Sequence, residues 1–492
     1  MHFRRVAAAL ALVMASGCQG PAGQDGGNRA WVGTLPMRDT GFDRRTWQDT
    51  SADIVRQLME RLPDRIESAS QHRLARNLLI SIADAPQGDD GGGALLARRV
   101  EILMRLGNAR DAAALARAAR NPPRDQTGAR REIEAELLAG TVEMACIDLR
   151  ALAARSPIQW AQDGLALCKL RAGEPGAMPP TGTGGLGSLA RIAGAPLPED
   201  ADPDSGIAYL AAFGSDPKVP AARRLNAAFA AARASALGGD SYAKVLRAAA
   251  VRDPAPPSVG PVSGEQAAAL FQAIGRAADP RQKLALAERG LLSPDGAIDG
   301  VSAAMVEPLR AVRPDPALAP FAARFAICFY AVGDIKAATP WADLAKRSGS
   351  GSAVWPYRAL LKPPGAGELA EWQKRAQLDP ASRERIVAIL SAFDIAPPEQ
   401  RADAGAGDAA DDPQEIDKAA TQLHVGETTL RALAMLGDAG PAGVSPRTLH
   451  QVLKSLDRVA LHDEARALAF EAITAVVIAK PKRKIGGNRA NA

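Results

Sequence analysis

The feature that most constrains this chain is a helical spacing of alanine and leucine that recurs on both sides of short glycine turns. Apolar residues in 96–106 follow the three-to-four spacing of one helix face, Gly107-Asn108 then turns the chain, and 112–119 begins a second helix. Hydrophobic residues make up 47% of the chain but aromatic residues only 4%, so alanine and leucine must fill the core. Because small side chains let helices approach closely, whereas strands favour bulky ones, the sequence predicts an all-α protein.

The same helical hairpin is expected three more times, over 132–154, 321–346 and 449–477. Aligned on their turns, the four hairpins repeat small or apolar residues five positions after the turn and again seven positions later. These residues are Ala112, Ala145, Ala338 and Ala465, followed by Ala119, Leu152, Ala345 and Ala472. In the first helices, Ile133, Ala326 and Leu453 hold a matching packing position, and Phe329 and Leu456 hold a larger apolar one.

This register resembles the tetratricopeptide (TPR) repeat, in which small residues let paired helices pack. The resemblance implies a solenoid-like or multi-lobed array of helical hairpins, with an extended surface that binds peptides or proteins. The family's tryptophan and tyrosine are mostly missing, and the repeats are not contiguous. The whole chain is similar to uncharacterised exported helical-repeat lipoproteins of GC-rich Gram-negative bacteria, a resemblance that implies no activity.

The first 18 residues have the pattern of an export signal. Two arginines precede an apolar run over 6–15 that is too short to span a bilayer, and Ala15-Ser16-Gly17 leads into Cys18. This resembles a bacterial lipobox, although Ala15 stands where leucine is usual. The resemblance implies lipidation at Cys18; cleavage by an ordinary signal peptidase, or no processing, are the alternatives.

Proline- and glycine-rich stretches divide the rest of the chain. We predict a flexible tether over 19–50, an N-terminal helical-hairpin domain over 51–175, a linker over 176–206 and a central helical domain over 207–397. An acidic linker over 398–416, C-terminal hairpins over 417–479 and a basic disordered tail over 480–492 follow. The segment 207–292 is expected to be helical but cannot be aligned with the repeat.

Export implies an oxidising compartment, in which cysteines can form stable disulfides. Cys146 and Cys168 lie on successive expected helices and form either a disulfide or two buried thiols. Cys328 lies on an apolar helix face and is expected in the core. The chain has no CxxC, so the sequence supports neither a zinc ribbon nor a thioredoxin-like site.

The net charge of +5 comes from the two ends of the chain, and the body between them is close to neutral. A nucleic-acid-binding protein is expected to carry a basic face on its folded part, so we predict no nucleic-acid partner. The basic tail over 480–492 is either a solvated end or a contact for anionic lipid or an acidic partner.

A search for catalytic, metal-binding and cofactor-binding residues selects none. The G-x-G-x-x-G at 182–187 follows prolines and is expected to be linker. Glu67-Ser68 matches the first two residues of the lytic transglycosylase motif but lacks its glycine-rich continuation. His450 and His462 lie twelve residues apart, and solvated side chains explain them better than a metal site. Trp47 precedes the first helix and is expected to pack there as a staple or to cap the domain; an interface anchor is the alternative.

These observations predict a non-enzymatic binding or scaffold protein of the cell envelope. It would be anchored by lipid at Cys18, face the periplasm, most simply from the outer membrane, and bind another envelope protein through its helical surface without a cofactor. The alternatives are an enzyme acting on cell-wall glycan with a helical scaffold, and a soluble periplasmic structural protein.

Overall fold

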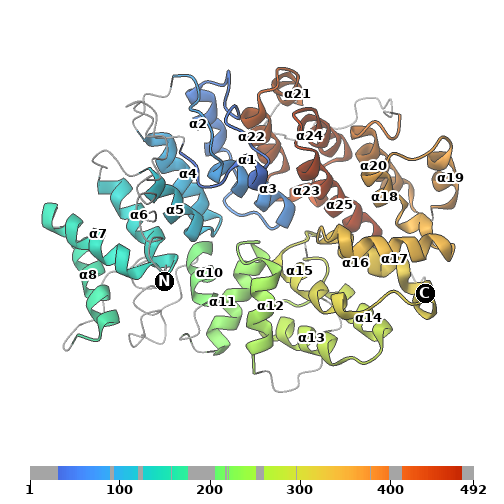
Figure 1. The fold of residues 1–492 in the computed structure, drawn as a ribbon, viewed down its shortest axis with the longest axis horizontal. Coiled ribbons are helices and arrows are strands. Elements are labelled where there is room, and N and C mark those ends of the chain that lie inside the picture. Colours follow the sequence, from blue (N-terminus) through green and yellow to red (C-terminus); the bar gives the residue numbers. More distant parts are fainter. Residues whose placement is uncertain are drawn as a thin grey trace, which may run out of the picture.

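The computed structural model of the protein is all-α, as the alanine-leucine spacing predicts (Figure 1). It describes residues 32–88, 93–119, 126–156, 158–174, 206–215, 219, 221–250, 257, 260–294, 296–376, 378–397 and 413–478. Within these residues there are 24 α-helices and no strand, apart from two isolated bridges.

The helices of the first half of the chain are α1 (Met37–Thr40), α2 (Ala52–Glu60), α3 (Ala69–Ile80), α4 (Ala94–Arg105), α5 (Ala109–Ala118), α6 (Gln126–Leu138), α7 (Val142–Arg155), α8 (Gln159–Ala172), α10 (Ile207–Ser215), α11 (Ala221–Arg233) and α12 (Gly239–Ala248). The remaining helices are α13 (Gly264–Arg276), α14 (Pro280–Arg289), α15 (Gly300–Val306), α16 (Ala322–Ala331), α17 (Ile335–Arg347), α18 (Trp355–Leu361), α19 (Glu368–Arg375), α20 (Pro380–Ala392), α21 (Pro413–Thr421), α22 (Val425–Leu436), α23 (Gly440–Gly443), α24 (Pro446–Arg458) and α25 (His462–Ile478).

Each of the four expected hairpins is a pair of consecutive helices that pack together: α4–α5, α6–α7, α16–α17 and α24–α25. Three of their turns place a glycine in the left-handed region, with φ of +83° at Gly107, +81° at Gly140 and +74° at Gly333. Glycine adopts this conformation without steric cost, so each turn is fixed by its own sequence. The fourth turn uses Ala460, at φ +66°.

The residues that the repeat register assigns to helix packing are buried. Ala112, Ala145, Ala338 and Ala465 are fully buried. Ala119, Leu152, Ala345 and Ala472 are also buried, as are the five selected residues of the first helices. The segment 207–292, expected to be helical but not aligned with the repeat, forms α10 to α14.

The helices follow a closed path, so that the last helices of the described chain lie beside the first. In Figure 1, α1 to α3 lie between α4–α6 on one side and the helices α21–α25 on the other, while α10–α14 and α16–α20 complete the circuit. Helix α2 packs on α22, and α3 packs on both α22 and α25. The first and last helices of the circuit therefore share one interface.

Residues 32–50 differ from the flexible tether predicted for 19–50, because they are packed against the helices. Phe42 and Trp47 are 0% and 2% exposed. Trp47 lies against Gly426 of α22, where even a Cβ atom would come within 2.4 Å of the indole ring. Trp47 therefore packs against α22 among the C-terminal helices, a contact that its position in the sequence did not predict.

Arg99 of α4 binds the segment that precedes α1. Its buried guanidinium donates to the carbonyl oxygens of Leu79 at 2.7 Å, Val32 at 3.0 Å and Ser81 at 3.3 Å. Burial lowers the pKa of Arg99 to about 9. The three carbonyl dipoles replace water around the charge. Through them the arginine holds the backbone at Val32 against the C-terminal end of α3.

A buried carboxylate joins three distant segments at the shared interface. Glu471 of α25 is 1% exposed and accepts hydrogen bonds from the hydroxyls of Ser68 at 2.8 Å and Ser70, and from the backbone N–H of Ile298 at 3.1 Å. Ser68 is also the N-cap of α3, where it accepts from the N–H of Gln71. Burial raises the pKa of Glu471 to about 6, against the opposing effect of these hydrogen bonds.

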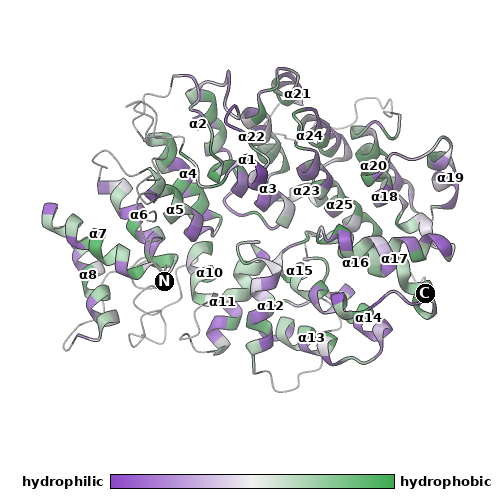
Figure 2. Ribbon diagram, viewed as in Figure 1, coloured by the Kyte–Doolittle hydropathy of each residue, from purple (hydrophilic) through white to green (hydrophobic). Residues whose placement is uncertain are grey.

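One main hydrophobic cluster draws residues from all three predicted helical segments, 51–175, 207–397 and 417–479. A second, smaller cluster lies around α6, α7, α8 and α10. Figure 2 shows hydrophobic and hydrophilic residues alternating along the helices, as expected when each helix buries one face. The segment boundaries stay a prediction, and residues 413–416 of the predicted acidic linker begin α21.

Candidate binding groove

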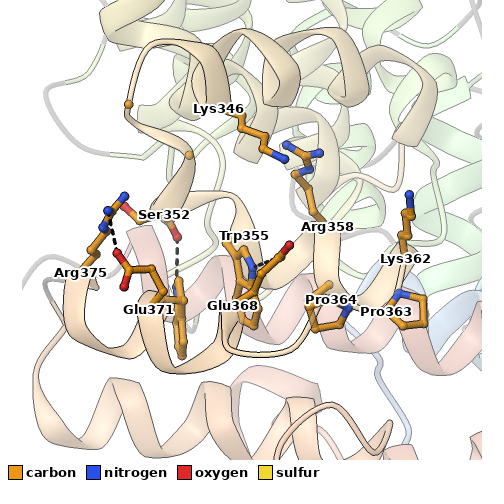
Figure 3. A pocket seen from close by; sticks show the side chains of 15 residues that line it. Lys346, Ser352, Trp355, Arg358, Lys362, Pro363, Pro364, Glu368, Glu371 and Arg375 are labelled. Atoms are coloured by element: carbon orange, nitrogen blue, oxygen red, sulfur yellow. Dashed lines mark hydrogen bonds and ion pairs between the residues drawn. The ribbon is translucent and has the colours of Figure 1, made fainter.

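A groove of about 650 Å³ opens between α17, α18 and α19 (Figure 3). The 3₁₀ turn Gly351–Ala353 and the loop 362–367 complete its walls. Prolines set its shape: Pro356 lies in the first turn of α18, and Pro363 and Pro364 follow the end of that helix. Gly367, at φ +85°, then turns the chain into α19.

Two stacked indole rings support the groove. The ring centroids of Trp355 and Trp372 are 5.2 Å apart with an angle of 19° between the planes. The N–H of Trp372 donates to the carbonyl of Ser352 at 3.1 Å, and that of Trp355 donates to a carboxylate oxygen of Glu368 at 3.2 Å. Trp372 is only 3% exposed, while Trp355 is half-buried. The pair therefore fixes α18 against α19 and leaves little indole surface free.

Charged side chains surround the indoles, and cations outnumber carboxylates four to two. The cations are Lys346, Arg358, Lys362 and Arg375; the carboxylates are Glu368 and Glu371. Figure 3 shows the ends of the Lys346 and Arg358 side chains pointing toward one another.

The two carboxylates of the groove lie one helical turn apart on α19. Glu371 forms an ion pair with Arg375 at 2.6 Å, and Glu368 accepts from the Trp355 indole. A pair of carboxylates could in principle act as general acid and base on a glycosidic bond. In this groove each carboxylate is already held by a donor, which suits a structural or binding role.

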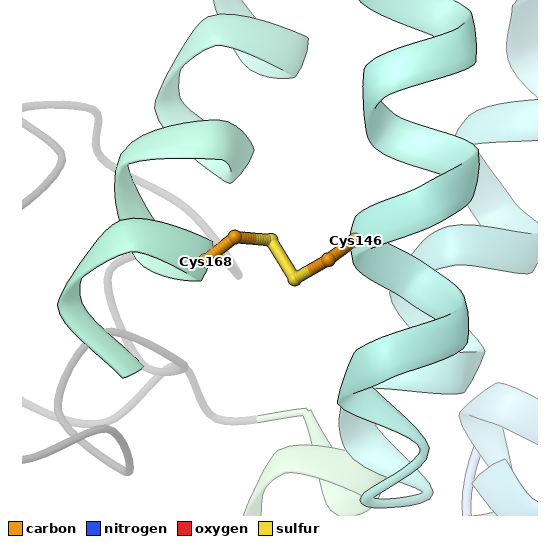
Figure 4. Close-up of a disulfide and its surroundings, with 2 residues drawn as sticks. All are labelled: Cys146 and Cys168. Atoms are coloured by element: carbon orange, nitrogen blue, oxygen red, sulfur yellow. A yellow bond between two sulfur atoms is a disulfide. The ribbon is translucent and has the colours of Figure 1, made fainter. Parts of the chain in front are cut away.

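The structure joins Cys146 of α7 to Cys168 of α8 by a disulfide, one of the two alternatives left open by the sequence (Figure 4). Their Cα atoms are 5.9 Å apart, within the usual range. Cys328 is a buried free thiol, as its apolar helix face predicts.

One group of acidic side chains has an arrangement that a metal ion could use. Carboxylate oxygens of Glu132, Glu136 and Asp148 lie within 4.8 Å of one another between α6 and α7. Glu136 is also 3.9 Å from the guanidinium of Arg117. The group is absent from the sequence-based search, because its members are spread over two helices without a ligand motif.

The residues considered for chemistry in the sequence have structural partners. Ser68 of the Glu67-Ser68 pair caps α3, and Glu67 pairs with Arg65 at 3.1 Å. His450 contacts Ser391 of α20 at 2.9 Å, and His462 pairs with Asp457 at 2.6 Å. The two histidines thus have separate partners.

Several predictions fall outside the described residues: Cys18, the glycine motif at 182–187 and the basic tail over 480–492. Among the described residues, no helix combines the length and apolar character needed to cross a membrane.

The groove residues were missed because they match no catalytic or ligand motif. The available signal was a concentration of tryptophan, proline and lysine over 355–375, in a chain with only six tryptophans. No protein-family model, curated protein or solved structure matches this chain.

Proposed function

We propose that the protein is a non-enzymatic binding or scaffold protein of the cell envelope. It is anchored through lipid at Cys18 at the periplasmic side of the outer membrane and holds another envelope protein at the α17–α19 groove. Its hairpins are TPR-like, and binding at a helical surface follows from that relationship.

The observation that carries the proposal is the groove itself. It is preformed, because three prolines, a turn glycine and a stacked indole pair set its shape, and a preformed site binds without a large ordering cost. Arginine, which lines the groove at Arg358 and Arg375, is among the side chains most enriched at the energetic centres of protein interfaces. The Cys146–Cys168 disulfide supports an oxidising compartment, where such bonds persist.

The test is membrane fractionation and affinity isolation with wild-type protein and Cys18→Ser. Wild type should incorporate labelled palmitate, sediment with membranes and co-isolate a defined envelope protein. The Cys18→Ser protein should lose the label and the sedimentation. A wild-type protein that remains unlabelled and in the soluble fraction would contradict the anchored scaffold and leave the soluble periplasmic structural protein.

A glycan-acting enzyme is the second candidate, and the Glu368 and Glu371 pair beside tryptophans is the observation that favours it. Purified wild type, Glu368→Gln and Glu371→Gln would be incubated with peptidoglycan and the soluble products separated. Release of muropeptides by wild type alone would establish the enzyme.

A further inference from the structure

The part of the chain that forms the groove is strongly basic. Residues 335–375 contain seven lysines and arginines and three acidic residues, a difference of +4, while the whole 492-residue chain has a net charge of only +5. The groove wall itself has four cations and two carboxylates. Because a concave wall concentrates the field of its charges, the groove attracts an anionic ligand.

Two cations of the groove, Lys346 and Lys362, have no acidic partner among the described residues. Among the described residues, the ammonium groups of Lys346 and Lys362 make no ion pair or hydrogen bond, and both lysines are exposed. Arg358 forms an ion pair with Asp343 at 3.7 Å, and both of these side chains are partly exposed. Lys346 and Arg358 nevertheless point toward one another (Figure 3). An anion between them would relieve this repulsion and gain charge-assisted hydrogen bonds.

The aromatic surface argues against a neutral sugar as the ligand. A sugar ring stacks on an exposed indole face, but here the indoles of Trp355 and Trp372 stack on each other, and Trp372 is 3% exposed. The charged groups are therefore the most accessible part of the wall. The groove volume lies within the range that ligand sites of a few residues or rings occupy.

The geometry points to a carboxylate-rich peptide segment of the partner as the ligand of this groove, with Lys346, Arg358 and Lys362 binding its acidic side chains. This inference rests on the proposed function, since it names the part of the envelope protein that the scaffold binds. Recognition of acidic segments by clustered cations is a recurring mode of peptide binding.

The test measures fluorescence anisotropy with full-length protein in mild detergent. The probes are a fluorescein-labelled peptide of alternating aspartate and alanine and its analogue with asparagine at every aspartate. The groove variant is Lys346→Glu with Lys362→Glu. The matched control is Lys169→Glu with Lys244→Glu, which changes the net charge equally at exposed lysines of α8 and α12.

Wild type and control should bind the aspartate peptide alike, and the groove variant should bind it at least about tenfold more weakly. The asparagine peptide should bind at least about tenfold more weakly to wild type, and raising NaCl from about 50 to about 500 mM should weaken the aspartate complex. Thermal unfolding of both double variants checks that they fold.

Equal losses in the groove variant and the control would show that only overall charge matters and would overturn the inference. Equal affinity for the two peptides would also overturn it, as would groove-dependent binding of a neutral N-acetylglucosamine oligomer or of single-stranded DNA in preference to the aspartate peptide. The proposed function is tested separately. If the groove binds the peptide but the protein has no lipid and no membrane association, the proposed function is wrong and this inference stands.

Discussion

The buried carboxylate of Glu471 should make the stability of the protein fall between acid and neutral pH. Glu471 is 1% exposed, and its hydrogen-bond donors among the described residues are all neutral groups, on Ser68, Ser70 and Ile298. Burial raises its pKa from 4.5 to about 6. A group with a raised folded-state pKa stabilises the fold fully below its unfolded pKa, and that contribution is lost as the pH rises through the folded pKa.

The magnitude follows from the shift. A difference of about 1.5 pKa units at about 1.4 kcal/mol per unit gives about 2 kcal/mol of stability that disappears between the unfolded pKa of 4.5 and about pH 7. The variant Glu471→Gln keeps the side-chain shape and an acceptor oxygen but cannot ionise. As the pH rises across this interval, the free energy of unfolding of the variant minus that of wild type should therefore increase by about 2 kcal/mol, whatever the difference between the two proteins at low pH.

The assay is urea unfolding followed by far-UV circular dichroism, at pH steps from about 4.5 to about 7.5. Glu60→Gln, at an exposed position of α2, is the matched control and should run parallel to wild type. If the difference between Glu471→Gln and wild type stays constant across this interval, the pKa of Glu471 is the same in the folded and unfolded chain, and the reasoning from burial is refuted.

Three further predictions concern packing and cross-links. Replacing both disulfide cysteines by serine should lower the free energy of unfolding by about 3 kcal/mol, because the bond closes a loop over a separation of 22 residues; chemical unfolding of the oxidised and variant proteins measures this. Gly426→Ala should destabilise by about 1–3 kcal/mol through its contact with an indole ring, whereas Gly275→Ala, with nothing within 4 Å, should not lower the melting temperature. Arg233→Met should cost about 3–5 kcal/mol by leaving Asp299 buried without its ion pair at 2.7 Å, and adding Asp299→Asn should recover part of that loss.

The local part of this fold was accessible from sequence, because each hairpin is determined by residues close together in the chain. Gly107, Gly140 and Gly333 mark three turns by a conformation that other residues avoid, and the alanines that follow them are buried. The contact between the first and last helices could not be predicted from the sequence. The bond between Ser68 and Glu471 joins residues 403 positions apart, and no periodicity reports such a pairing.

The groove was hidden for a different reason. Lysines, prolines and tryptophans serve many roles, so their presence over 355–375 becomes informative only when α18 and α19 fold back on α17. Trp47 shows the same limit. Its sequence position suggested a staple on the next helix or a domain cap, and could not show the contact with Gly426, far along the chain.

The contact of α2 and α3 with α22 and α25 has a consequence for the order of folding. The early hairpins can form as they are synthesised, but the interface that holds α3 needs helices from the last part of the chain. Until those helices are made, α3 packs against its near neighbours α1 and α4, and the part of its surface that α22 and α25 cover is available to chaperones. In a ribosome-bound chain this interface would therefore be incomplete, and it would form only after the final helix emerged.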